Sequence, residues 1–233
     1  MKKITGSFVL ATLAAAVITA PAHALEHYVA LMAGYYAGPS VMGAVGFTDV
    51  FTKIPIAFEL EGGHSWTNPG DPALARDVFI NNNDGGDDDA QKDGSVWDFG
   101  LNALYPLNQT YGPVKFFVFG GPRYAHFDGH FDYVGGNEDF DVIANSWGLG
   151  GGLRGVMPLG KGFSGILQLG VDYYFPTSIY GHDATYYPND SNINARAAQE
   201  AGDPANYTYT YADATRAVNV PRLRPRVMIG IQF

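Results

Sequence analysis

The chain has 233 residues, no cysteine and a formal net charge of −9. The lack of cysteine excludes a disulfide framework, a thiolate metal site and covalent haem attachment, and the acidic balance argues against nucleic acid as a partner. The chain is rich in glycine (30) and in aromatic residues (15 Phe, 15 Tyr and 3 Trp) at a mean hydropathy near zero. A membrane β-barrel gives this composition, because its lipid-facing and lumen-facing residues alternate.

Residues 1–24 have the three parts of a secretory signal peptide. Two lysines follow the first methionine, residues 8–18 form an apolar stretch, and residues 22–24 (Ala-His-Ala) place small side chains at a cleavage site. The apolar stretch is shorter than the roughly 20 residues that a spanning helix needs. We therefore expect export and a mature domain over residues 25–233, in which 12 basic and 23 acidic residues give a net charge of −11.

Apolar residues at every second position predict β-strands along the mature chain. A turn signal at Gly38-Pro39-Ser40 divides the segment 28–47 into two strands, with one long or bulged strand as the alternative. Further segments show the same alternation, most clearly 163–176 and 220–233. The predicted strands are 28–37, 41–48, 54–66, 95–105, 113–126, 143–157, 163–176 and 220–233. Their number, eight, is even, as a closed antiparallel barrel requires.

The connections between these strands alternate in length. Those at 49–53, 106–112 and 158–162 are short, whereas those at 67–94, 127–142 and 177–219 are long. Bacterial outer-membrane barrels have this asymmetry, with tight periplasmic turns and long extracellular loops. A water-soluble barrel of the lipocalin type is the alternative, but it would turn its apolar face inward. In this chain the apolar face of each strand is suited to contact lipid, and the charged face must point into the barrel, away from lipid.

These features resemble the OmpA-like, OmpX-like and opacity-type small outer-membrane barrels. The resemblance rests on the last strand, 227–233 (VMIGIQF), and on the early hairpin of 43–47 (GAVGF) and 56–63 (IAFELEGG). It implies an all-β, eight-stranded transmembrane barrel in the bacterial outer membrane, and it implies that Phe233 is the terminal signal read by the barrel-assembly machinery. OmpA-like proteins often continue into a peptidoglycan-binding domain; residues 25–233 contain none, so wall attachment is not implied.

Strand parity assigns a set of charged side chains to the lumen. They are Glu59, Glu61, Asp98, Lys115, Arg123, Arg154, Asp172, Arg222, Arg224 and Arg226. Buried charged groups must form ion pairs or stay hydrated. We therefore expect Asp172 to pair with an arginine of the last strand, and Glu59 and Glu61 to pair with the other arginines of that strand across the lumen. The network is either a packed plug or a gate in a pore; an eight-stranded barrel is only wide enough for its own side chains, which favours the plug.

The predicted outer loops are strongly acidic. They hold 17 of the 23 acidic residues and four basic ones, with the densest run in 81–94. This run offers oxygen ligands for calcium, but its spacing does not match an EF-hand, and a solvated acidic loop is the favoured interpretation.

His126 and His130 share one strand face without an evident third ligand, so no metal site is predicted. A tyrosine cluster in the last loop (186, 187, 207, 209 and 211) predicts a strand extension above the membrane or, alternatively, a sticky surface.

Aromatic residues near the predicted strand ends are candidates for the interfacial girdles, of which some are expected to face lipid. They are Tyr28, Tyr35, Tyr36, Trp66, Trp97, Tyr105, Tyr111, Tyr124, Trp147, Tyr173 and Tyr174.

No catalytic pair is predicted. His64-Ser65 resembles the catalytic strand of lipid A deacylases, but their His and Ser are separated by one residue and share a face, whereas adjacent residues of a strand point to opposite faces. We expect a structural or surface-interaction protein without cofactor; a narrow porin-like channel for ions or small solutes is the alternative, and a barrel enzyme acting on lipid the least favoured. The expected partners are outer-membrane lipid, the barrel-assembly machinery and a surface ligand or host molecule.

Overall fold

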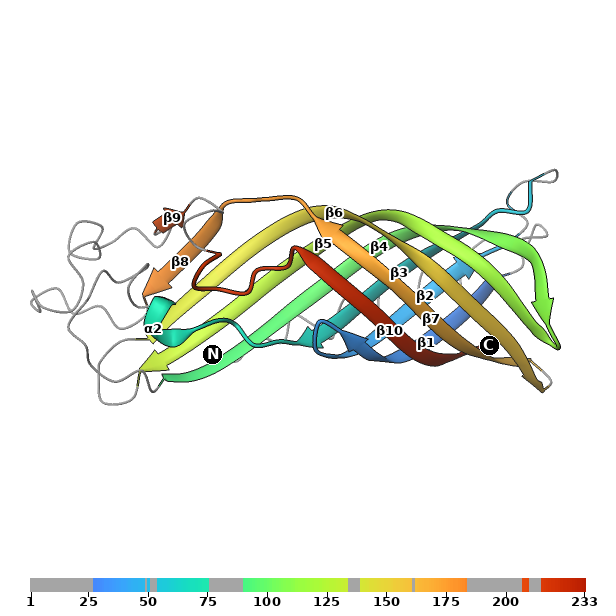
Figure 1. The fold of residues 1–233 in the computed structure, drawn as a ribbon, viewed down its shortest axis with the longest axis horizontal. Coiled ribbons are helices and arrows are strands. Elements are labelled where there is room, and N and C mark those ends of the chain that lie inside the picture. Colours follow the sequence, from blue (N-terminus) through green and yellow to red (C-terminus); the bar gives the residue numbers. More distant parts are fainter. Residues whose placement is uncertain are drawn as a thin grey trace, which may run out of the picture.

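A computed structural model shows the chain as a closed antiparallel β-barrel (Figure 1). The structure describes residues 27–48, 50, 54–75, 90–133, 139–160, 162–183, 207–209 and 215–233. The signal peptide predicted at 1–24 lies outside these residues, as does most of the acidic run 81–94.

Eight strands form the barrel wall, as predicted. They are β1 (His27–Tyr36), β2 (Pro39–Phe47), β3 (Ala57–Trp66), β4 (Ala90–Tyr111), β5 (Val114–Tyr133), β6 (Asp139–Gly160), β7 (Phe163–Tyr174) and β10 (Leu223–Gln232). Each pairs with its neighbour, and β10 closes the barrel on β1 with Ala30 opposite Gln232 and Tyr36 opposite Arg226. The segment 28–47 forms two strands, because the chain reverses at Ala37-Gly38, where the φ of Ala37 is 55°.

Three strands are longer than the alternation predicted. β4, β5 and β6 have 22, 20 and 22 residues, about twice the 9–11 residues that cross a bilayer. They project beyond the long-loop end of the barrel, so the loops predicted at 67–94 and 127–142 begin or end inside strands. At the opposite end β4 and β5 meet at a tight turn through Gly112, whose φ is 57°, and the C-terminus also lies there (Figure 1). By the asymmetry of outer-membrane barrels this second end is the periplasmic one.

Two short strands extend the projecting wall. β8 (Ile179–Asp183) pairs with the outer part of β6, and β9 (Tyr207–Tyr209) pairs with β8. β8 thereby continues the path of β7 beyond residues 175–178. The expected strand extension is thus present at Tyr207 and Tyr209, whereas the cluster's other three tyrosines lie outside the described residues.

The outer face of the wall carries the apolar residues of the alternation. Leu31, Leu101, Leu153, Val227 and Ile229 are between 42% and 69% exposed, while the residues between them point inward. A continuous apolar face of this kind belongs against hydrocarbon, and a closed barrel can enter hydrocarbon because its strands pair their backbone polar groups with one another. Among the described residues, no helix is long and apolar enough to span a membrane.

The interior is filled in layers along the barrel axis. At the periplasmic end Ala57, Leu104 and Phe119 form an apolar layer, with Phe117 packed against it. A second group of inward residues includes Met32, Ala44 and Met228. Of the charged side chains, Glu59 and Arg154 lie at the level of the first layer, since Arg154 is paired with Phe117 and Glu59 is the next inward residue after Ala57, and the others lie farther along the lumen. Beyond them a larger apolar cluster fills the projecting half of the barrel.

Two segments fold over the outer mouth and complete that last cluster. We call them the outer cap: residues 67–75, which include the short helix α2 (Pro72–Ala75), and residues 215–221. The amide of Asp71 donates to the carbonyl of Ala217 (2.9 Å), and that of Asn219 to the carbonyl of Pro69 (2.8 Å). Lys92 Nζ donates to the carbonyl of Gly70 (2.9 Å). Beneath these bonds the cap places Ala75, Ala217, Val218 and Val220 against inward side chains of β4, β5 and β6.

Deleting Phe233 is expected to lower the yield of assembled barrel. Its amide and carbonyl form the last two hydrogen bonds of the closing seam, both with Val29 (3.0 and 2.9 Å), and its ring, 49% exposed, lies 6.2 Å from that of Phe163. The measurement is the heat-modifiable protein recovered in outer membranes, with Phe233→Tyr as the control that keeps a terminal aromatic. An equal yield from the deletion variant would contradict the role inferred for this residue.

Candidate functional site: the charged layer of the lumen

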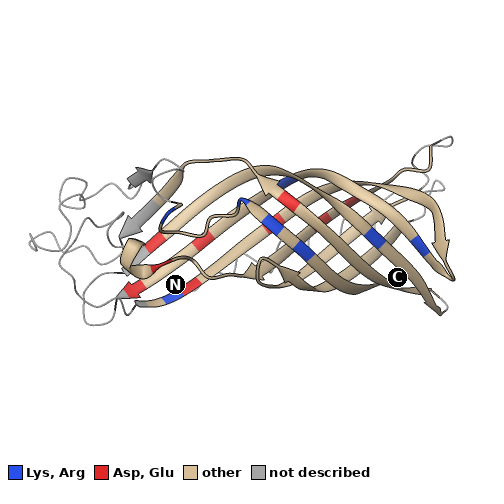
Figure 2. Cartoon of the chain, viewed as in Figure 1, with Lys and Arg blue, Asp and Glu red and all other residues tan. Residues whose placement is uncertain are grey.

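Eight charged side chains meet in the middle of the barrel. They are Glu59 and Glu61 of β3, Asp98 of β4, Arg123 of β5, Arg154 of β6, Asp172 of β7, and Arg224 and Arg226 of β10, and each is at most 4% exposed. We call this set the lumen network. Four arginines balance four carboxylates, so the layer carries no net charge. Figure 2 shows acidic and basic positions side by side on the strands of this region.

The centre of the network is a cluster of two arginines and two carboxylates. Arg226 donates to Glu61 (2.7 Å) and to Asp172 (2.5 Å). Arg123 Nε lies 3.2 Å from Asp172 and 3.6 Å from Glu61. Each carboxylate is therefore shared by two guanidinium groups that come from opposite sides of the lumen, which ties β3, β5, β7 and β10 together.

A bidentate pair lies toward the periplasmic side. The two Nη atoms of Arg154 donate to the two carboxylate oxygens of Glu59, at 2.6 and 2.7 Å. Tyr28 Oη (2.8 Å) and Asn102 Nδ2 (3.0 Å) also donate to Glu59, and Gln168 Oε1 accepts from Arg154 (2.6 and 2.9 Å). Neutral side chains thus form hydrogen bonds with carboxylate lone pairs and guanidinium protons that the ion pair itself does not use. A buried ion pair is stable only when these remaining groups also have partners.

A third pair lies toward the outer side. Arg224 Nη1 donates to both oxygens of Asp98 (2.9 and 2.8 Å), and its Nη2 donates to the carbonyl of Tyr36. Tyr174 Oη donates to Asp98 (2.8 Å). Tyr36 Oη donates to Asp172 and lies 2.7 Å from Tyr174 Oη, which joins this pair to the central cluster.

The ring of Tyr36 also separates two of the arginines. The guanidinium carbons of Arg224 and Arg226 lie 4.1 and 4.6 Å from its centroid. Cation–π attraction to a buried ring offsets part of the repulsion between the two cations. Tyr36 therefore acts in the network through its ring, its hydroxyl and its backbone carbonyl.

Two glycines provide the room for the central cluster. A Cβ at Gly150 would lie 1.6 Å from Asp172 Oδ1, and one at Gly100 would lie 2.9 Å from both Arg123 Nη1 and Glu61 Oε1. The charged groups therefore lie directly against bare backbone of the neighbouring strand, where Gly150 is paired with Asp172 and Gly100 with Glu61 and Arg123. Any side chain at Gly150 would displace the carboxylate of Asp172.

The structure brings together eight of the ten charged residues that parity assigned to the lumen. Lys115 and Arg222 are instead exposed. They have inward parity, but Lys115 lies next to the periplasmic turn and Arg222 precedes β10 at the other end, so neither reaches the enclosed part of the lumen. Asp172 and Glu61 pair with Arg226 of the last strand as expected, whereas Glu59 pairs with Arg154.

Three aromatic residues proposed for the membrane rims lie in the lumen instead. Tyr28, Tyr36 and Tyr174 are at most 8% exposed and join the network through their hydroxyl groups. Tyr28 and Tyr36 share the parity of Met32 on β1, and Tyr174 shares that of Asp172 on β7, which is the sequence signal that distinguishes them from rim residues. On the outer face Tyr35, Trp66, Tyr105 and Trp147 are 48–65% exposed, as girdle residues are.

The histidines have other partners. His126 Nδ1 lies 2.7 Å from Asn145 Oδ1, and His130 Nδ1 lies 2.8 Å from Asp141 Oδ1. In the described part of the chain, no three His, Asp or Glu side chains are grouped so that they could hold a metal ion. His64 packs on the outside against the ring of Trp66, edge to face at 4.8 Å, and against the tilted ring of Trp97 at 4.6 Å, whereas Ser65 is buried on the inside and is hydrogen-bonded to Ser40. The two therefore lie on opposite faces of β3.

The fold matches that of a solved outer-membrane protein. A major outer membrane protein from Thermus thermophilus superimposes with a TM-score of 0.70 over 91% of this chain and 99% of that one, at 22% identity. Neisserial surface protein A is also similar, with a TM-score of 0.42 and 12% identity over 90% of this chain and 98% of that one. No protein-family model matches, and no curated protein matches by sequence. The likeness to the first structure shows that this chain has the β-barrel fold of an outer-membrane protein.

Proposed function

We propose that this outer-membrane β-barrel is a non-conducting scaffold that anchors an extracellular β-wall and its loops for contact with other molecules at the cell surface. The observation that carries the proposal is the filled lumen. Charges that line a conducting pore need water, but here each of the eight is paired inside a narrow barrel. The chain would reach this location through its signal peptide and the barrel-assembly machinery.

Apolar layers on both sides of the central cluster support the same proposal. Phe119, 3% exposed, lies between the central cluster and the Glu59–Arg154 pair, with its ring 5.8 Å from the guanidinium carbons of Arg226 and Arg154, whereas Phe127 and Phe131 are fully buried on the outer side. A water-filled path would have to cross both layers, at the full cost of removing ions from water. The charged network therefore stiffens the barrel and does not select solutes.

The outer half of the molecule supports the surface role. β4, β5 and β6 continue beyond the membrane-spanning length and carry long, acidic connections. A wall with its own apolar core holds the attachment points of these loops in place. Loops on a rigid support are the usual location of binding residues. The expected partner is a cationic or aromatic surface ligand or host molecule.

Planar-bilayer recordings test the proposal. The purified barrel is expected to show no discrete single-channel openings, and Asp172→Asn is expected to show none either, because the apolar layers remain in place on both sides of the altered central cluster. A porin reconstituted in the same lipid serves as the positive control. Regular unitary openings of the unaltered protein would contradict the scaffold and favour the narrow channel.

A further inference from the structure

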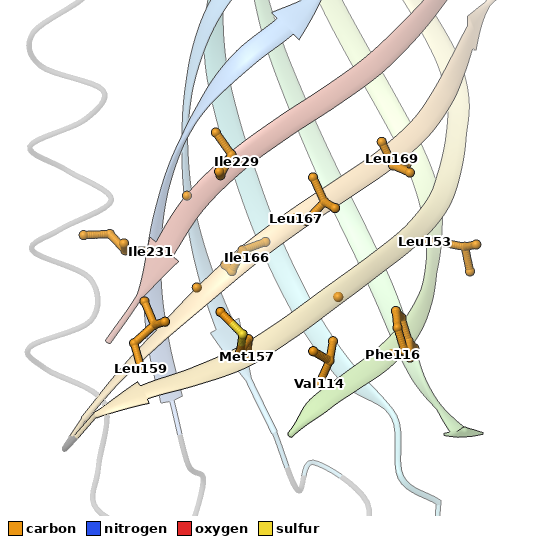
Figure 3. Close-up of a pocket in the computed structure, with 13 residues that line it drawn as sticks. Val114, Phe116, Leu153, Met157, Leu159, Ile166, Leu167, Leu169, Ile229 and Ile231 are labelled. Atoms are coloured by element: carbon orange, nitrogen blue, oxygen red, sulfur yellow. The ribbon is translucent and has the colours of Figure 1, made fainter. Parts of the chain in front are cut away.

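The outer wall has a deep apolar groove near its periplasmic end. It has a volume of about 740 Å³ and crosses β5, β6, β7 and β10 (Figure 3). Its walls include Phe116, Met157, Leu159, Leu167, Ile229 and Ile231, and Gly155 and Gly165 form part of its floor. The volume lies within the range of about 300–1,000 Å³ typical of small-molecule sites.

The groove faces the hydrocarbon of the membrane. Its flanking side chains point outward and are strongly exposed, with Leu159 at 57% and Ile229 at 69%. Every heavy atom of the named wall side chains is carbon except the sulfur of Met157, so none of them offers a hydrogen bond to an occupant. The occupant must therefore be apolar along its length.

The shape favours a flexible chain over another folded protein. The floor lies low because glycine leaves no side chain there: an added Cβ at Gly155 would already touch Phe116 and Val114 (3.5 Å), and one at Gly165 would touch Leu159 (3.4 Å). A second barrel has a convex wall, which would touch the rims of the groove before it reached this floor. An acyl chain is narrow enough to lie along the floor and contact both walls.

The charge at the same end indicates the head group. Within the described residues of 106–116 and 156–166, which surround the periplasmic end of the groove, Lys115 is the only charged side chain, and it is exposed. Its backbone lies between Val114 and Phe116, two residues that line the groove. Its parity is inward, but it stands beside the periplasmic turn at the end of the barrel and outside the enclosed lumen. A lysine near a membrane surface attracts anionic lipid, and its long stem lets the ammonium group reach the interface.

We propose that this groove holds one acyl chain of an anionic phospholipid of the periplasmic leaflet, with the lipid phosphate near Lys115. The inference goes beyond the scaffold role and does not depend on it: it rests on the position of the barrel in the membrane, whether or not the lumen conducts. The bound lipid would fix the depth of the barrel on one side, over β5, β6, β7 and β10.

Photo-crosslinking in vesicles tests the site. The probe is phosphatidylglycerol with a diazirine in one acyl chain, and the attachment points are mapped by peptide mass spectrometry. We expect labelling concentrated in residues 153–169 of the unaltered protein and lost from there in Gly155→Leu, which fills the groove. Gly43→Leu, on the outer face of β2 where a Cβ has only Leu31 nearby at 3.9 Å, is the matched control and should keep the labelling.

Two further variants make the result decisive. If Gly155→Leu does not assemble into a heat-modifiable barrel, Leu159→Ala removes a wall of the groove and should also reduce the labelling. Phosphatidylglycerol should label the groove more than phosphatidylcholine does, and Lys115→Gln should reduce that preference. Labelling spread evenly around the wall, or unchanged in the groove variants, would overturn the proposal.

A second copy of the chain is the competing occupant. Because the chain has no cysteine, Met157→Cys places a single thiol in the groove. A disulfide-linked dimer of this variant in vesicles would assign the groove to a protein interface and overturn the lipid proposal. A variant that stays monomeric and remains labelled by the lipid would support it.

Discussion

Asp172→Asn is expected to lower the free energy of unfolding of the barrel by about 3–5 kcal/mol, the range for breaking a buried ion pair by removing one partner. The carboxylate of Asp172 accepts hydrogen bonds from Arg226, Arg123 and Tyr36. After the substitution two guanidinium groups share Glu61 alone, and the lumen gains a net positive charge. From the sequence we would expect only about 1–3 kcal/mol, the cost of one undercompensated group.

The measurement is urea unfolding of the barrel in lipid vesicles, followed by tryptophan fluorescence. Asp132→Asn removes an exposed carboxylate from the same barrel and is the matched control, expected to change stability by less than about 0.5 kcal/mol. If the two variants unfold alike, the central cluster does not contribute to stability as its geometry implies.

Phe127→Ala is expected to destabilise the projecting half of the barrel by about 3–5 kcal/mol, as truncation of a large buried aromatic residue does. Phe127 is fully buried in the cluster that the outer cap completes. The cavity left by its ring would lie beneath the cap, outside the membrane. The loss of stability should therefore be local, and the membrane-embedded wall should stay intact.

Hydrogen exchange followed by mass spectrometry measures this effect. The amides of residues 139–146 of β6, which pair with this part of β5, should exchange faster in the variant, while those of 150–157 should not change. Tyr180→Ala, at an outward position of β8 that is 44% exposed, is the control. Unchanged exchange at 139–146 would show that the outer cluster does not hold the projecting wall together.

The strands could be predicted because the membrane imposes a strict period of two on them. Each lipid-facing position of β7 and β10 is apolar or small, and this makes the pattern visible without any tertiary information. The ends of β4, β5 and β6 could not be predicted in this way. Outside the membrane the outer face meets water, so residues such as Asp128 and His130 replace the apolar ones and the segment has the composition of a loop.

Parity identified most of the lumen network, but it could not assign its partners. Whether Glu59 meets Arg154 or an arginine of β10 depends on the height of each residue along the axis, which the tilt and shear of the barrel determine. Strand parity also does not show where the enclosed lumen ends. For this reason the prediction from parity placed Lys115 and Arg222 in the lumen. The outer cap depends on contacts between residues about 150 positions apart, such as Asn68 and Asn219; the apolar residues Ala217, Val218 and Val220 were its only local sign.

The distribution of the network over the strands has a consequence for assembly. Its four arginines and four carboxylates come from β3, β4, β5, β6, β7 and β10, and the central cluster draws on both the third strand and the last. An intermediate with some strands still outside the bilayer would hold unpaired charges in a low-dielectric interior, at several kcal/mol per ion. Every partly inserted form is therefore raised in free energy, which makes insertion and barrel closure a single cooperative event. In that event the arginines of the last strand neutralise the carboxylates that the earlier strands have brought into the membrane.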